Sequence, residues 1–112
     1  MRHSYLVPCR VSTCFGLFLL GLLTACASAP VQEMSDARQA INAAEQAGAE
    51  ESAPQALEVA RKLLTDAESQ LQGGRYFAAR RNAVQAKTKA LEALEATDGD
   101  KKKKEAENAD RH

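Results

Sequence analysis

The chain has 112 residues and a formal net charge of zero, which bounds it to one small domain. Its composition changes near residue 26, and a chain beginning at Cys26 would keep 13 basic and 15 acidic residues, a net charge of −2. Because positive and negative charges nearly balance, the protein has no electropositive field that would steer it onto nucleic acid, and no nucleic-acid partner is expected.

Residues 1–25 have the layout of a secretory signal peptide. Arg2 and Arg10 give the start a positive charge, and residues 11–25, reading VSTCFGLFLLGLLTA, are almost wholly apolar and end in small residues. This apolar run is shorter than the roughly 20 residues that a membrane-spanning helix needs. The alternative of an uncleaved membrane anchor is therefore disfavoured.

The end of the leader, reading LTAC at residues 23–26, resembles the lipobox of bacterial lipoproteins. The resemblance implies signal cleavage between Ala25 and Cys26, with a diacylglycerol on the Cys26 thiol and a further acyl chain on the new amino group. About two acyl chains suffice for stable membrane anchoring. No Asp follows the cysteine, and the sorting pattern of such lipoproteins then implies the outer membrane, facing the periplasm. The alternative is a soluble secreted protein cut after Ala27 or Ala29.

Residues 26–34 are expected to form a lipidated tether, which Pro30 keeps non-helical, and residues 35–97 a helical domain. Ser35 is predicted to cap a first helix that ends at Gly48. The capping-box pattern SAPQ, with Ser52 at the cap, is predicted to begin a second helix, which the pair Gly73-Gly74 ends. Both segments repeat small or apolar residues every three or four positions, at Met34, Ala37, Ile41 and Ala44 and at Ala53, Leu57, Ala60, Leu64, Ala67 and Leu71.

A third helix is predicted from about Arg75 to Ala96, with Phe77, Val84 and Leu91 seven residues apart on its inner face. Two such helices joined by Gly-Gly should form an antiparallel hairpin. The first helix can cover its open side, so the predicted fold is all-α, a small alanine-rich hairpin or three-helix bundle. Residues 98–112 show no apolar periodicity and are expected to form a charged, disordered tail.

Residues 36–96 resemble the bacterial envelope family called domain of unknown function 4398 (DUF4398). The shared cadence is AxxAIxxAExAGA followed by APxxLxxAxxxLxxAExxLxxGxYxxAxxxAxxA. A weaker likeness to half of a tetratricopeptide repeat rests on Gly74, Tyr76, Ala79 and Ala86. That likeness fails at Asp66 and Gln70, where Leu and an aromatic residue are expected, and about three repeats are needed to bury a core.

No enzyme is predicted. The expected helical domain contains no histidine, so its serines lack an imidazole base. There is no CxxC or HExxH motif and no glycine-rich phosphate loop, and scattered carboxylates are poor metal ligands. The expectation is no catalytic residue, no metal site and no cofactor.

Tyr76 and Phe77 are the only aromatic residues after Cys26. They either plug the end of the hairpin or form a binding anchor, at the tip expected farthest from the tether, among Arg75, Arg80 and Arg81. The predicted function is a non-enzymatic outer-membrane lipoprotein, a structural or protein-interaction module with an envelope protein partner or self-association. The alternative is an accessory binder of peptidoglycan or anionic polymer through these three arginines and Lys101 to Lys104.

Overall fold

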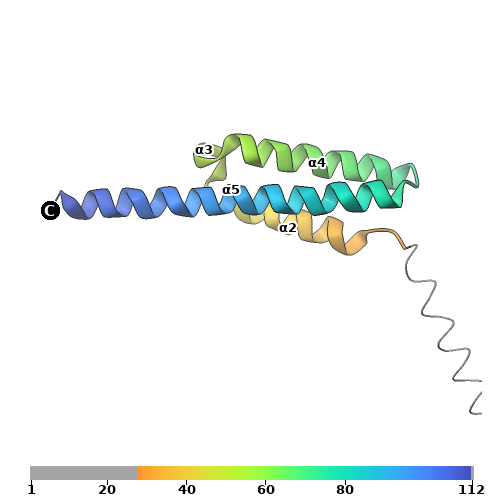
Figure 1. Ribbon diagram of the computed structural model, residues 1–112, viewed down its shortest axis with the longest axis horizontal. Helices are drawn as coiled ribbons and strands as arrows, with labels where there is room; N and C mark the ends of the chain where they lie inside the picture. The colour runs from red at the N-terminus through yellow and green to blue at the C-terminus, as the bar shows by residue number, and fades with distance from the viewer. Residues whose placement is uncertain (1–27, 112) are drawn as a thin grey trace, which may run out of the picture.

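The computed structural model describes residues 28–111, and within them it contains helices and no strand. The elements are α2 (Val31–Ala47), the short α3 (Ala49–Ser52), α4 (Pro54–Gln72) and α5 (Tyr76–Asp110). In Figure 1, α2 and α5 run in the same direction and α4 runs in the opposite direction. Helix α5 packs against both α2 and α4. The predicted all-α helical bundle is confirmed. The predicted signal peptide, the cleavage site and Cys26 lie outside the described residues.

The first helix begins earlier than expected. Pro30, not Ser35, occupies the N-cap of α2, and the Met34 amide donates to the Pro30 carbonyl at 3.1 Å. Proline has no amide to donate but can accept this first helical bond, so it marks the helix start rather than a longer non-helical tether. Ser35 lies inside the helix, where its hydroxyl accepts a bond from Gln39 Nε2 at 3.4 Å. The helical domain therefore starts at Val31 instead of residue 35.

Gly48 ends α2, as predicted. Its backbone is left-handed, with φ 97°, and its amide donates to the carbonyls of Ala44 and Glu45. Only glycine adopts this conformation without steric cost. The chain then turns directly into α3.

We expect Gly48→Ala to lower the free energy of unfolding by about 1 kcal/mol, because a Cβ strains the left-handed backbone. No heavy atom lies within 4 Å of the added Cβ, so crowding does not contribute. The matched control is Gly99→Ala, inside α5, where the added Cβ also meets nothing within 4 Å and alanine favours the helix. Urea unfolding followed by circular dichroism should separate the two, and equal midpoints would contradict the assigned strain.

The start of α4 also differs from expectation. Ala53 is the N-cap and makes no side-chain capping bond, while Ser52 belongs to α3, so the predicted capping box is wrong. Pro54 does occupy the first turn, where its missing amide is not needed. The far end agrees with the prediction: α4 stops at Gln72, and Gly74 takes the left-handed conformation of the turn, with φ 73°.

Alanines, rather than the larger apolar residues, form the buried face of α5. Phe77, Val84 and Leu91 were expected inside but are 79%, 48% and 40% exposed. The helix lies against both α2 and α4, and two backbones can approach it closely only where its side chains are small. The residues that are fully buried on α5 are Ala79, Ala83, Ala86, Ala90, Ala93 and Thr97.

The C-terminal segment, expected to be disordered, continues α5 as helix to Asp110. Thr97 is the last buried residue, and its hydroxyl donates to the Ala93 carbonyl at 2.8 Å. Beyond it every side chain in residues 98–110 is exposed. These residues are rich in Lys, Glu and Ala, which favour helix, and the bundle has already supplied the costly nucleus. We call residues 98–110 the arm; at 1.5 Å per residue it is about 20 Å long.

Candidate functional site

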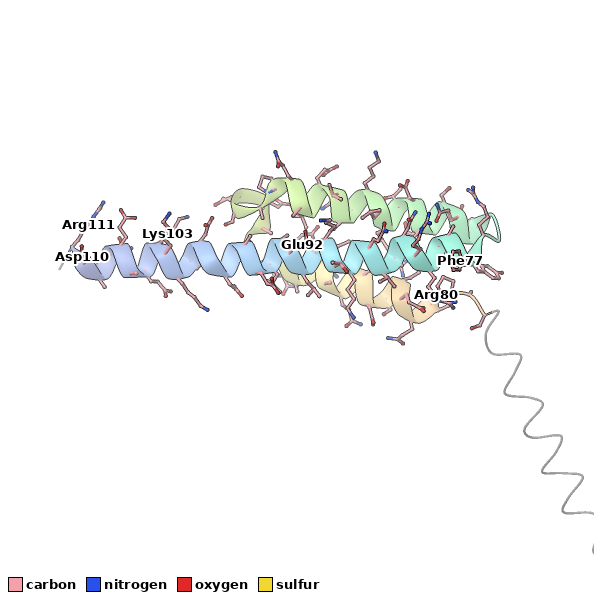
Figure 2. The ribbon with its side chains drawn as sticks, viewed as in Figure 1. Phe77, Arg80, Glu92, Lys103, Asp110 and Arg111 are labelled. Atoms are coloured by element: carbon pink, nitrogen blue, oxygen red, sulfur yellow. The ribbon has the colours of Figure 1, made fainter. Side chains whose placement is uncertain are left out.

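The predicted interaction residues gather at the start of α5. Arg75 is the N-cap, and Tyr76 and Phe77 form the first turn; we call these three residues the aromatic tip. The Phe77 ring projects from the end of the bundle in Figure 2. The tip lines a shallow pocket together with Ser28, Gly74 and Arg80. The aromatics therefore do not plug the hairpin, since most of the Phe77 side chain faces outward.

The aromatic tip lies beside the tether, which corrects the expectation that it is the point farthest from it. Arg80 makes this connection: its Nε donates to Glu33 Oε1 at 2.8 Å and its Nη2 donates to the Ser28 carbonyl at 3.2 Å. The turn between α4 and α5 and the start of α2 occupy the same end of the bundle (Figure 1). The parallel course of α2 and α5 causes this placement.

The arginines around the tip differ in their availability. Arg80 is occupied by Glu33 and Ser28. Arg75 and Arg81 are exposed, and neither forms an ion pair with another residue in the range 28–111. No acidic residue lies in the first turn of α5. The tip thus combines exposed aromatic surface with two uncompensated positive charges.

Two carboxylates of α2 are held in their charged form at this end of the molecule. The pKa of Glu33 is lowered by a backbone hydrogen bond and then by Arg80. The pKa of Asp36 is lowered by the amide of Gln32, which donates at 2.8 Å, and then by Lys87, whose Nζ lies 3.3 Å away. Both ion pairs join α2 to α5, so they fix the register of these two helices.

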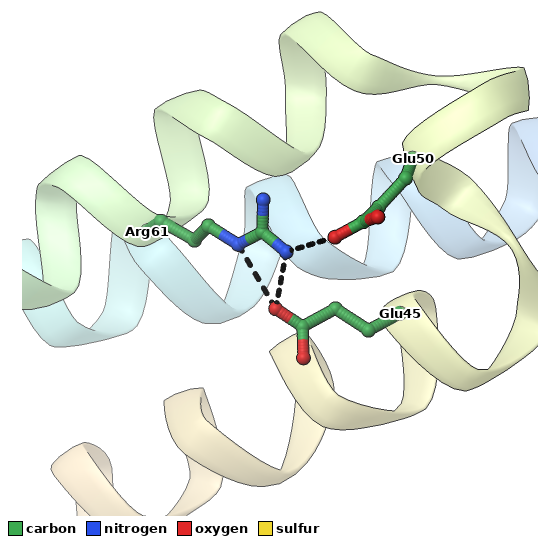
Figure 3. A network of polar contacts seen from close by, with 3 residues as sticks. All are labelled: Glu45, Glu50 and Arg61. Atoms are coloured by element: carbon green, nitrogen blue, oxygen red, sulfur yellow. Dashed lines mark hydrogen bonds and ion pairs between the residues drawn. The ribbon is translucent and has the colours of Figure 1, made fainter.

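Arg61 links three helices at the opposite end, a feature that the sequence did not reveal (Figure 3). From α4, its Nε and Nη2 donate to Glu45 Oε1 of α2 at 2.9 and 2.6 Å, and Nη2 also reaches Glu50 Oε1 of α3 at 2.6 Å. These bonds, first to Glu50 and then to Glu45, raise the pKa of Arg61. Ion pairs exposed to this degree each contribute little to stability. Their arrangement indicates a structural clamp, and Arg61 and Glu50 also line a shallow pocket together with Pro54 and Leu57.

The basic residues predicted to act together do not form one site. Arg81 and Lys101 stand on the same helix about 30 Å apart at 1.5 Å per residue. Four consecutive lysines, Lys101 to Lys104, also surround a helix of 3.6 residues per turn instead of sharing one face. The acidic residues of the arm outnumber these four lysines by one: Asp98, Asp100, Glu105, Glu107 and Asp110.

Among residues 28–111, no group of His, Cys, Asp and Glu side chains is arranged to hold a metal ion. In the same range, no helix is both apolar enough and long enough to span a bilayer.

Comparison with known proteins agrees with the alanine-rich pattern. The profile of a family described as a domain of unknown function (DUF4398) matches residues 32–109, which include the arm as well as the bundle. No curated protein and no solved structure shows a significant match. Because the profile covers more than half of the sequence, the chain belongs to the DUF4398 family.

Proposed function

We propose that the protein is an outer-membrane lipoprotein, anchored through acylated Cys26 and facing the periplasm, whose helical bundle serves as a non-enzymatic interaction module. The observation that carries this proposal is the arm. A helix whose side chains are all exposed adds no buried apolar area to the core, so its stability comes from the bundle that nucleates it. The arm extends the reach of the protein and offers an exposed surface for contact with a partner.

The leader supports the same proposal. The sequence LTAC closes an apolar run that follows two arginines. Only four residues separate Cys26 from Val31, the first residue of α2, and the last of these four is the N-cap Pro30. Acyl chains on Cys26 would hold such a protein on a membrane without a spanning helix. The bundle would then stand close to the lipid surface, and the arm would point away from it.

A protein partner suits the arm better than an anionic polymer does. Polymer binding through charge requires a concentrated positive surface, whereas the lysines of the arm encircle the helix among five acidic residues. The alternative, an accessory binder of peptidoglycan, then rests on Arg75 and Arg81 alone. Charge-driven binding to polymer weakens steeply as ionic strength rises, and this dependence separates the two classes.

The test is photo-crosslinking in living cells, with the photoreactive residue placed at Ala106 of the arm. We expect a discrete band containing another envelope protein, because Ala106 is exposed on the arm. The matched control is Gln85, which is exposed on the bundle part of the same helix and should give no such band. A ladder of glycan adducts at Ala106 would instead support the polymer alternative, and absence of any adduct would contradict a contact role for the arm.

A further inference from the structure

The aromatic tip is exposed at the place where the chain enters the bundle. Phe77 is 79% exposed, the nearby start of α2 exposes Val31 to 67%, and Tyr76 is 41% exposed. In Figure 2 the Phe77 ring lies at the end of the molecule where α2 begins. Ser28 shares the shallow pocket with all three residues of the aromatic tip. The two most exposed large apolar side chains, Phe77 and Val31, thus lie at one end, next to the tether, whereas Val59, Val84 and Leu91 are exposed to a smaller extent elsewhere.

The tether limits how far this end can stand from the anchor. Cys26 precedes Ser28 by two residues, and an extended chain spans at most about 3.6 Å per residue, so their Cα atoms are no more than about 7 Å apart. The headgroup layer on each side of the hydrocarbon core is roughly 5–8 Å thick. If Cys26 is acylated as proposed above, the tether keeps the aromatic tip within reach of the lipid headgroups.

The chemistry of the tip matches that environment. Tyr is enriched at membrane interfaces, and Phe is among the residues that interfacial helices bury at the acyl boundary. Anionic lipid attracts nearby Arg side chains, and Arg75 and Arg81 are exposed and unpaired among the described residues. The nearest acidic residue of α2, Glu33, is already paired with Arg80 at 2.8 Å. A second copy of the chain would bring the same arginines against one another, which disfavours self-association through this end.

We propose that the aromatic tip docks on the anionic bilayer surface that holds the lipid anchor, with Phe77 in the headgroup layer and Arg75 and Arg81 on lipid phosphates. This inference deepens the proposed function and rests on the acylation of Cys26. Docking gives the molecule a second attachment besides its lipid anchor. It therefore sets the direction of α5, whose arm stands about 30 Å or more from the membrane at 1.5 Å per residue.

The experiment uses the full acylated protein, made in bacteria and reconstituted into vesicles of phosphatidylethanolamine and phosphatidylglycerol. Acylated Cys26 leaves no free thiol in the processed chain, so Gln72→Cys, at the end of α4 just before the turn, supplies a single site for a fluorophore. Lipids with nitroxide headgroups should quench this probe strongly, whereas the same probe introduced by Ala109→Cys on the arm should remain unquenched. Both positions are exposed.

Further substitutions test the chemistry. Adding Phe77→Ser should abolish most of the quenching at position 72, whereas Val84→Ser, at an exposed apolar residue two turns along α5, should leave it unchanged. The double change Arg75→Gln and Arg81→Gln should weaken quenching on the anionic vesicles to the level seen on phosphatidylcholine alone. Circular dichroism should show that each variant keeps its helical content, since all of these side chains are exposed.

The outcomes separate the two proposals. Mass spectrometry first determines whether Cys26 carries acyl chains, and an unacylated product would refute the anchor and with it the docking. An acylated protein with equal quenching at positions 72 and 109 would overturn the docking alone. A probe at position 72 that is shielded from iodide but not quenched by lipid would identify a protein occupant of the tip and would likewise overturn it.

Discussion

We expect Ala90→Leu to lower the free energy of unfolding by about 1–3 kcal/mol, and more if the helices must separate. Ala90 is fully buried in the cluster that contains Ile41, Leu57 and Ala60. Its methyl group lies where α5 meets both of its neighbours, so a leucine side chain has no space without displacing a helix. Since small domains are stable by only about 5–15 kcal/mol, this loss is a large share of the total.

The measurement is urea unfolding of residues 27–112, because every buried residue of the described range lies between Pro30 and Thr97. Ala96→Leu is the matched control: it makes the same change at an exposed position of α5 and should shift the free energy of unfolding by less than about 0.5 kcal/mol. Equal stability of the two variants would contradict the close packing of α5 between α2 and α4.

We expect Cys26→Ala to abolish labelling of the protein with radioactive palmitate and to block cleavage after Ala25. Each acyl chain contributes about 0.8 kcal/mol per buried CH₂, and a single chain binds membranes only marginally. Loss of all chains therefore removes stable anchoring by lipid. The readouts are palmitate incorporation, the mass of the processed chain and its fraction in washed membranes.

The leader supplies its own control for this experiment. Cys9→Ala and Cys14→Ala also remove a thiol, but from residues that the proposed cleavage discards. Both variants should be labelled and processed like the parent protein. Palmitate that persists on the Cys26→Ala variant would contradict the lipobox interpretation, whereas its loss from the Cys14→Ala variant would move the acylation site into the leader.

The three long helices and their order could be predicted from the sequence because glycine and periodicity act locally, whereas the short α3 was not predicted. Gly48 and the Gly73-Gly74 pair end helices through backbone conformations that depend little on the rest of the fold. The helix starts predicted at Ser35 and Ser52 were wrong for the opposite reason. Helix α2 starts earlier, after Pro30, and α4 starts later, after Ala53, and the choice of start depends on packing of the first turn. The sequence alone therefore determines a helix end only where no neighbouring residue could end or begin the helix equally well.

The face of α5 could not be predicted from side-chain size. Phe77, Val84 and Leu91 form the most hydrophobic line along the helix, yet the alanine line is buried because α5 has a neighbour on two sides. Ion pairs between helices could not be predicted from the sequence for a similar reason. The contact of Arg61 with Glu45 and Glu50 depends on the register of three helices, which no spacing within one helix specifies.

The uninterrupted length of α5 has a mechanical consequence. Its 35 residues form one helix from the turn to the end of the arm, a rigid rod about 52 Å long. If the whole bundle tilts by about 10° about the end that holds the turn, the far end of α5 moves by about 9 Å, because displacement grows with distance along the axis. The bundle end then acts as a fulcrum, and α5 is a lever that converts a slight rotation there into a sizeable movement at the opposite end.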